Sequence, residues 1–239
     1  MNAESTTDEI VAEVVAAGSP ERAASAQRFF KTGPGEYGEG DRFLGVAVPV
    51  LRSLATRLRG LPAEVVDALL ANELHEIRML ALLVLAENYR RADDPASWVE
   101  QYRCAVRAGR VNNWDLVDCS AAPILGDWLV QADGVDELLR WAASDGLWER
   151  RVGIVATHAF TTGGRSDAIL AVAPLVIDDR RDLIQKALGW MLREMGKRVD
   201  EPALLDFLET NAAAIGRTAL SYAIERLSPD QRKHFRGLS

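Results

Sequence analysis

The chain of 239 residues is long enough to bury a large core, in one domain or in two. Its composition is 48% hydrophobic, 26% charged and only 7% aromatic, which is typical of a globular protein and excludes disordered and fibrous classes. The net charge of −7 argues at first sight against a nucleic-acid partner. The first 100 residues, however, hold 10 basic and 16 acidic side chains, whereas the rest hold 18 and 19. The second half can therefore present a local positive surface.

The sequence has no basic, apolar leader segment and no apolar run of about 18 residues. We therefore expect a cytoplasmic protein with no membrane partner. Its two cysteines, Cys104 and Cys119, should then be reduced thiols.

Residues 1–7 are polar and are expected to form a flexible N-terminus. The segment from Gly33 to Asp41 holds four glycines and a proline, which predicts a loop. Almost everything else shows the three- and four-residue spacing of amphipathic helices, and no segment alternates like a strand. The clearest helical segments are Val65–Leu70, Met79–Leu85, Val135–Trp141, Ile169–Val176, Leu183–Met195 and Leu204–Leu208.

Five segments repeat one pattern, a polar or basic residue followed by small and aliphatic residues. They begin near positions 78, 112, 150, 186 and 217, at steps of 34, 38, 36 and 31 residues. This period, with another helix before each segment, is typical of a solenoid of helix pairs. Since such repeats cannot bury their faces alone, we expect one all-α repeat domain over residues 8–239, with a concave side suited to an extended partner.

Trp190 lies on the border of a predicted amphipathic helix. On a helical wheel, it falls beside Lys186, Arg193 and Lys197, so the indole shares a face with three cations. One interpretation is a boundary tryptophan that covers the core, and the other is a functional indole.

Trp114 and Asp118 are four residues apart, which places them one above the other on a helix face beside the apolar stripe. Asp115 is expected to point further toward solvent. For Asp118 the alternative to a functional role is an ion pair with an arginine of a neighbouring repeat.

Arg151 and His158 are seven residues apart and nearly in line on a third helix. The simplest expectations are a solvated arginine and a neutral histidine at the edge of the core. The three histidines are too scattered in the sequence for a metal site, and no phosphate-binding loop or nucleophile motif occurs. The sequence therefore predicts neither a metal nor another cofactor.

Four ordered phrases resemble the DNA alkylation repair family of HEAT-like-repeat glycosylases, the AlkD type. They are F-L-G-V-A-V-P (Phe43–Pro49), W-D-L-V-D (Trp114–Asp118), S-D-G-L-W-E-R-R (Ser144–Arg151) and K-A-L-G-W-M-L-R-E (Lys186–Glu194). The resemblance spans about 150 residues and implies an all-α HEAT-like solenoid with a concave DNA-binding face.

By matching position, the resemblance implies that Trp114, Asp118, Arg151 and Trp190 form the active cleft. Additional phosphate contacts are expected from five basic residues of the second half: Arg150, Lys186, Arg193, Lys197 and Arg198. Asn113 stands where some members have a further tryptophan, and we expect this position to affect contact with DNA rather than catalysis.

The implied activity is hydrolysis of the N-glycosidic bond of positively charged N3- or N7-alkylated purines in double-stranded DNA. It would need no cofactor and no closed pocket for an extruded base, and the protein would act as a monomer. The alternative is a non-catalytic module that binds DNA or serves as a protein scaffold, since helical repeats often form docking surfaces.

Overall fold

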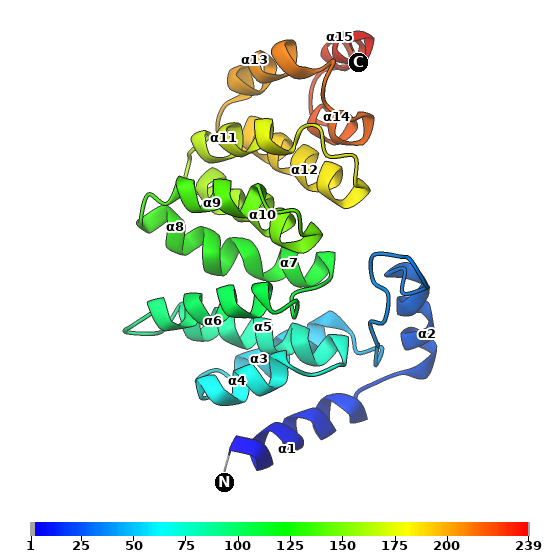
Figure 1. The fold of residues 1–239 in the computed structure, drawn as a ribbon, viewed down its shortest axis with the longest axis vertical. Helices are drawn as coiled ribbons and strands as arrows, with labels where there is room; N and C mark the ends of the chain where they lie inside the picture. The colour runs from blue at the N-terminus through cyan, green and yellow to red at the C-terminus, as the bar shows by residue number, and fades with distance from the viewer. Residues whose placement is uncertain (1–2, 239) are drawn as a thin grey trace. The chain divides into compact units, whose positions relative to one another are not determined.

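The computed structural model describes residues 3–238 and is all-α over that range (Figure 1). Within these residues, the only strand-like pairing is an isolated bridge between Arg42 and Leu74. The chain divides into two compact units, Met1–Ser120 and Ala121–Ser239. The first unit contains α1 (Ala3–Ala16), α2 (Pro20–Phe29), α3 (Val48–Arg57), α4 (Ala63–Leu70), α5 (His75–Tyr89), α6 (Ala96–Arg107) and α7 (Trp114–Ser120). The second contains η1 (Ala121–Gly126), α8 (Asp127–Gln131), α9 (Val135–Ala142), α10 (Leu147–Thr162), α11 (Asp167–Val176), α12 (Asp182–Arg198), α13 (Glu201–Asn211), α14 (Arg217–Ala223) and α15 (Pro229–Leu238).

All six helical segments expected from periodicity lie inside observed helices, and the glycine-rich stretch 33–41 forms turns. At the N-terminus, α1 begins at Ala3 and so includes most of the stretch expected to be flexible, and its flexibility stays a prediction; residues 1 and 2 lie outside the described part. The expectation of one repeat domain over residues 8–239 stays a prediction.

The first unit is built around α5. Its segment M-L-A-L-L-V-L-A, residues 79–86, is apolar on all sides, which is typical of a helix surrounded by others. It packs against α3, α4, α6 and α7, and nearly all of its residues are buried. Polar side chains in its first turn, His75, Glu76 and Arg78, are therefore buried with it and need partners.

The second unit is a stack of helix pairs (Figure 1). Helices α10, α12 and α14 pack side by side, and α9, α11 and α13 each pack against one or two of them. The predicted repeat starts at 150, 186 and 217 fall in α10, α12 and α14, so the period follows the second helix of each pair. Gly189 of α12 allows close packing, because a Cβ there would collide with the Ala219 carbonyl of α14.

The division between the units follows Ser120, where α7 ends and the π-helical turn η1 begins. Pro123 lies in this turn and has no N–H to donate, which disfavours regular α-helical hydrogen bonding. Within the described residues, no helix is both long and apolar enough to cross a bilayer.

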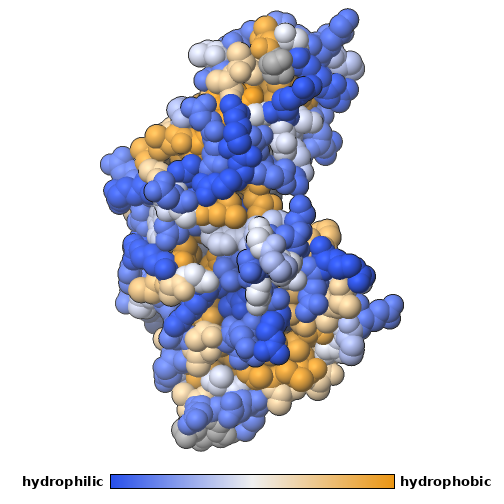
Figure 2. Space-filling model, turned by 45° about the vertical axis from the view of Figure 1, so that its right-hand side comes forward, coloured by the Kyte–Doolittle hydropathy of each residue, from blue (hydrophilic) through white to orange (hydrophobic). Residues whose placement is uncertain are grey.

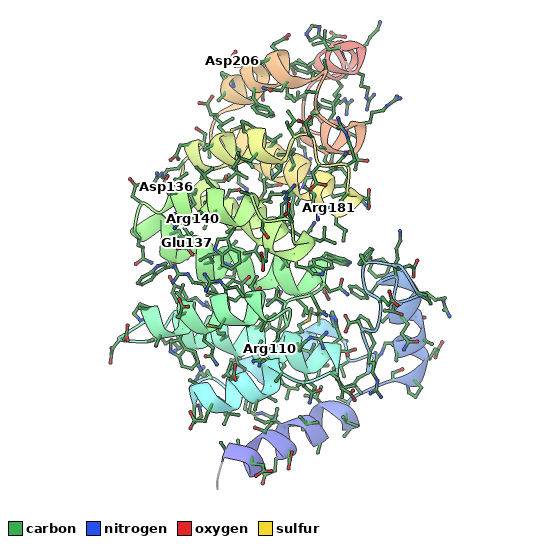
Figure 3. The ribbon with its side chains drawn as sticks, in the orientation of Figure 1. Arg110, Asp136, Glu137, Arg140, Arg181 and Asp206 are labelled. Atoms are coloured by element: carbon green, nitrogen blue, oxygen red, sulfur yellow. The ribbon has the colours of Figure 1, made fainter. Side chains whose placement is uncertain are left out.

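Polar residues cover most of the face shown in Figure 2, and apolar patches interrupt them. The exposed large apolar side chains of the described residues include Phe29, whose surface is 66% accessible. Ion pairs also join surface segments within each unit. For example, Arg110, labelled in Figure 3, bonds Asp67 of α4 at 2.7 Å.

Candidate active site

Helix α7 carries the first pair of predicted site residues. Leu116, Val117 and Ser120 are buried, and α7 packs against α5. Trp114 and Asp118 lie one turn apart beside this apolar side, and both are only half-buried. The predicted juxtaposition of this indole and this carboxylate on one helix is therefore confirmed within the first unit.

An aromatic stack holds the indole of Trp114. The ring of Phe30 lies nearly parallel to it, with centroids 5.1 Å apart and planes at 18°. Phe43 stacks on Phe30 at 4.8 Å, and His75 stacks on Phe43 at 4.3 Å. The exposed Phe29 meets the indole edge-on at 5.9 Å. Trp114 is thus braced on one face by side chains from α2 and the loop that follows it.

Behind this stack lies a buried cluster of charged groups. The imidazole of His75 lies between two carboxylates, with Nδ1 at 2.7 Å from Asp41 and Nε2 at 2.9 Å from Asp115. The other oxygen of Asp41 accepts a hydrogen bond from Arg78 at 2.6 Å. Asn113 donates to Asp41 at 3.0 Å. The cluster joins the loop before α3 to the first turns of α5 and α7.

The charges of this cluster shift two pKa values. Burial alone would lower the pKa of His75, but the hydrogen bonds and charges of Asp115 and Asp41 raise it to about 9. Burial opposes ionisation of Asp41, yet His75, Arg78 and Asn113 outweigh it and lower the pKa of that carboxyl. At neutral pH, two carboxylates therefore face one imidazolium and one guanidinium, and their charges cancel.

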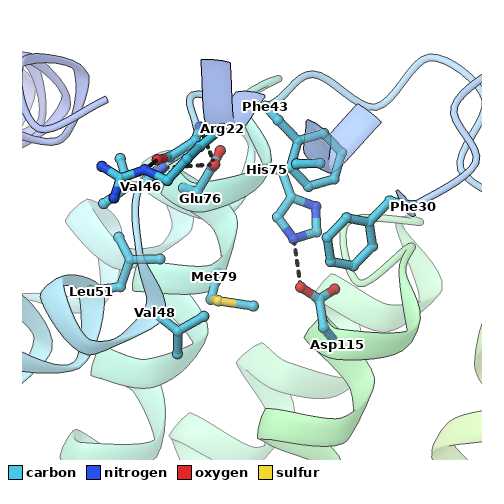
Figure 4. Close-up of a pocket in the computed structure, with 12 residues that line it drawn as sticks. Arg22, Phe30, Phe43, Val46, Val48, Leu51, His75, Glu76, Met79 and Asp115 are labelled. Carbon is cyan, nitrogen blue, oxygen red and sulfur yellow. Dashed lines mark hydrogen bonds and ion pairs between the residues drawn. The ribbon is translucent and has the colours of Figure 1, made fainter. Parts of the chain in front are cut away.

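A cavity of about 140 Å³ adjoins the cluster, between α2, α3 and α5 (Figure 4). The carboxylate of Glu76 in its wall already has partners within the protein, because it accepts hydrogen bonds from the backbone N–H groups of Leu44, Gly45 and Val46 at 2.7 to 3.2 Å. Gly45 has φ of 75°, and a Cβ there would collide with the backbone of Ser19 and Ala23. The phrase F-L-G-V thus describes a loop that wraps over a buried carboxylate.

In the second unit, Arg151 contacts α12, the helix that carries Trp190. Arg151 is only 4% exposed, and its guanidinium donates to the carbonyl of Leu183 in α12 at 2.5 Å. The expectation of a solvated arginine is therefore wrong. Trp190, also on α12, is half-buried and its ring lies 6.1 Å from that of His158.

His158 lies at the edge of the core, as expected from the sequence. It is half-buried, and burial together with the nearby charge of Arg198 lowers its pKa, which favours the neutral imidazole at pH 7.

Four of the five cations predicted to contact phosphate are engaged with carboxylates in the structure. Arg150 bonds Asp179 at 2.7 Å, and Lys186 bonds Asp182 at 2.8 Å. Glu194 accepts hydrogen bonds from both Arg193 and Arg198, at 3.2 and 2.7 Å, and Arg193 also bonds Glu225. Lys197 is exposed near the end of α12. These cations would have to share or release their carboxylates to hold a phosphate.

The predicted site residues thus fall into two local groups. Trp114 and Asp118 lie on α7, and Arg151 contacts α12, which carries Trp190. Convergence of the two groups on one sugar stays a prediction.

Sequence reasoning missed the buried cluster and misplaced two of its neighbours. Asp115 was expected to face solvent, but its side chain is only 14% exposed and is bonded to His75. Asn113 is fully buried and accepts a hydrogen bond from the backbone of Trp114 at 2.9 Å, so it cannot touch DNA directly. A signal did exist. His75, Glu76 and Arg78 open a helix that is apolar on every side, and buried polar groups require partners.

Both ring nitrogens of His75 are bonded to carboxylates, which leaves neither for a metal. Across residues 3–238, no three His, Cys, Asp or Glu side chains are grouped like metal ligands.

This geometry defines a class of protein. It is an all-α protein of stacked helix pairs that presents a braced indole and a carboxylate on one helix. The chain belongs to the DNA alkylation repair enzyme family, whose model matches residues 10–227. No curated protein matches it.

Two solved structures share the fold. A structure described as a predicted DNA alkylation repair enzyme from Enterococcus faecalis is 18% identical, with a TM-score of 0.72, and the match covers 89% of this chain and 97% of that one. The crystal structure of smu.31 from Streptococcus mutans is 13% identical, with a TM-score of 0.52, and covers 99% and 97%. At these identities, the two structures support the all-α fold alone.

Proposed function

We propose that this protein is a DNA glycosylase that hydrolyses the N-glycosidic bond of positively charged N3- or N7-alkylated purines in double-stranded DNA. The observation that carries the proposal is the pair on α7, where Trp114 and Asp118 lie one turn apart and both remain partly exposed. Family membership makes a DNA repair role the natural setting for that pair. The protein acts as a monomer in the cytoplasm.

The chemistry suits a single carboxylate. A purine alkylated at N3 or N7 already carries positive charge, so it leaves as a neutral base without a general acid. The sugar then becomes the electron-poor partner, because C1′ gains oxocarbenium character as the bond stretches. Asp118 stabilises this charge and orients the attacking water, and general-base assistance contributes roughly 10²- to 10⁴-fold in rate.

The indoles recognise the cationic nucleotide. A tryptophan face attracts a cation by about 0.5 to 2 kcal/mol, depending on how much water is excluded. Phe30 stacks on one face of Trp114 and Phe29 meets the ring edge-on, so the indole is braced although it is only half-buried. Trp190 supplies the second indole, and neither tryptophan is sealed inside the core.

Phosphate contacts come from the second unit. In this proposal Arg150, Lys186, Arg193, Lys197 and Arg198 make contacts that carry no sequence information. The buried Arg151 supports α12, the helix that carries Trp190, rather than touching a phosphate. Several of these cations are already bonded to carboxylates, which weakens their attraction for phosphate. The net charge of −7 weakens it further. The lesion is engaged through the backbone in an open cleft, without a closed pocket for an extruded base.

The alternative is a helical-repeat module that binds DNA or a protein without catalysis. The ion pairs of Arg150, Arg193 and Arg198 favour it to some degree, because a surface with neutralised cations holds DNA weakly.

Duplex DNA methylated at N7 of guanine separates these functions. We expect the purified protein to release 7-methylguanine and to leave alkali-labile sites. Uracil- and 8-oxoguanine-containing duplexes serve as matched substrates whose bases carry no positive charge, and they should remain intact.

The outcomes are distinct. DNA binding without release would favour the non-catalytic module, and absence of DNA binding would favour a protein partner. Efficient release of uracil would contradict the requirement for a cationic leaving group.

A further inference from the structure

The positions of the two carboxylates around His75 favour one protonation state when both carboxylates are ionised. A neutral imidazole has one N–H and one lone pair, so it can donate to only one of two ionised acceptors. Here Nδ1 and Nε2 each lie within hydrogen-bond distance of a different carboxylate, at 2.7 and 2.9 Å. Only the imidazolium satisfies both Asp41 and Asp115.

We propose that the His75 imidazolium is a positioning residue, an ionic clamp that holds the first turn of α7 and thereby sets the orientation of Trp114 and Asp118. The inference rests on the proposed glycosylase function for its catalytic consequence. His75 would not touch the substrate, since its side chain is only 2% exposed.

The clamp reaches α7 through two connections. The first is the bond from Nε2 to Asp115, the residue directly after Trp114 and three before Asp118. The second is the ring stack from His75 through Phe43 and Phe30 to the indole. One side chain therefore fixes both the backbone that carries the indole and the surface on which the indole rests.

The rest of the cluster anchors the clamp to the body of the first unit. Arg78 donates to the Asp41 oxygen that His75 does not contact, at 2.6 Å, and to the side chain of Asn112 at 3.2 Å. Asn113 bonds Asp41 and also the backbone N–H of Trp114. The segment that enters α7 is thus tied at consecutive residues.

The clamp should open at alkaline pH. The charged groups that face or adjoin His75 are Asp41 from the loop, Asp115 from α7, Glu76 and Arg78 from α5, and Arg22 from α2. Loss of the imidazole proton leaves one of the two carboxylates without its donor and leaves the buried cluster with one unbalanced negative charge.

Nuclear magnetic resonance of the histidine rings tests the clamp without any substrate. The chain has only three histidines, so His75→Phe and His234→Gln variants assign their signals. We expect the His75 ring to remain protonated at pH 8 and to titrate near pH 9. In Asp115→Asn, which keeps an acceptor oxygen but removes the charge, its midpoint should fall. Titration of all three rings near or below pH 7 would overturn the proposal.

The indole of Trp114 gives a second readout. Its ring N–H signal, assigned with Trp114→Phe, should shift in step with the His75 titration and should change in His75→Phe, which keeps a ring against Phe43 but lacks both donors. His234→Gln is the matched control, since His234 bonds Glu209 at an exposed site of α15. An indole signal that changes neither during the titration nor in His75→Phe would overturn the clamp.

Catalysis gives the third readout. In His75→Phe and Asp115→Asn, the single-turnover rate of 7-methylguanine release should fall roughly 10- to 100-fold, as expected for a misplaced reacting group, while DNA affinity persists. The rates are compared at a temperature at which both variants remain folded, because removal of a buried partner also lowers stability. Unchanged rates would overturn the positioning role. If the wild type releases no base, the proposed function fails, and the imidazole and indole signals alone then decide the clamp.

Discussion

The first unit buries a charged cluster that is unlike the ion pairs on its own surface and most of those in the second unit. In the first, a guanidinium, an imidazolium and two carboxylates are buried together behind α7, and their side chains are between 1% and 14% exposed. In the second, most ion pairs involve at least one exposed partner, such as Lys186 with Asp182 or Arg193 with Glu225. Buried pairs order the groups around them, whereas surface pairs exchange readily with water and salt. The buried cluster therefore orders the groups around it, whereas the surface ion pairs can rearrange.

Removal of one partner from the buried cluster should have the largest effect on folding. Replacement Arg78→Ala leaves the carboxylate of Asp41 buried without its guanidinium, and we expect a loss of about 3 to 5 kcal/mol in the free energy of unfolding. Arg110→Ala, which breaks the exposed pair with Asp67, should cost no more than about 1 kcal/mol. Chemical denaturation measures both. Equal losses would remove the contrast between buried and surface pairs.

Close helix packing, rather than buried charge, should dominate the stability of the second unit. In Gly189→Ala, the added methyl meets the carbonyl of Ala219, and overpacking of this kind costs about 1 to 3 kcal/mol. Gly237→Ala in α15 is the control, because a Cβ there meets nothing within 4 Å. This control should be neutral or slightly stabilising, by at most about 1 kcal/mol. Thermal unfolding of the two variants provides the comparison.

The pH dependence of stability should reveal His75. Its pKa is about 9 in the folded chain against 6.5 for the ordinary group, so its contribution is complete below pH 6.5 and is lost as the pH rises through 9. Wild-type stability should therefore decline over this range more steeply than that of His75→Phe. Parallel pH profiles of the two proteins would show that His75 is not charged in the folded state.

The smallest expected effect concerns the surface cations. Lys197→Ala should weaken DNA binding about equally for all sequences and should reduce the slope of log affinity against log salt by about 1. Arg198→Ala should reduce it less, because Arg198 already bonds Glu194 at 2.7 Å. Binding titrations at several salt concentrations measure the slopes. A larger change for Arg198 would mean that its ion pair opens completely on DNA.

The sequence was sufficient to predict the helices and the juxtaposition on α7. Apolar spacing reports helices because each buries one side, and the spacing of Trp114 and Asp118 places them on one face by helix geometry. Both are local relationships, which a single chain segment specifies.

The buried cluster could not be predicted in the same way. Asp41, His75 and Asp115 are 34 and 40 residues apart, and no local period relates them. Arg78 fitted the pattern of the repeat starts, which concealed its role as a partner of Asp41. Long-range pairing of polar groups depends on how helices pack, and only the requirement that buried charges find partners pointed to it.

A single-turnover assay of Asp118→Asn on duplex DNA that contains 7-methylguanine tests the account most directly. The variant should release the base at least about 100-fold more slowly than the wild type while it binds the same DNA with nearly unchanged affinity. Asp206→Asn, at an exposed site of α13 labelled in Figure 3, is the matched control and should match the wild type. Release by Asp118→Asn at the wild-type rate would contradict the assignment of this carboxylate as the group that stabilises the sugar cation.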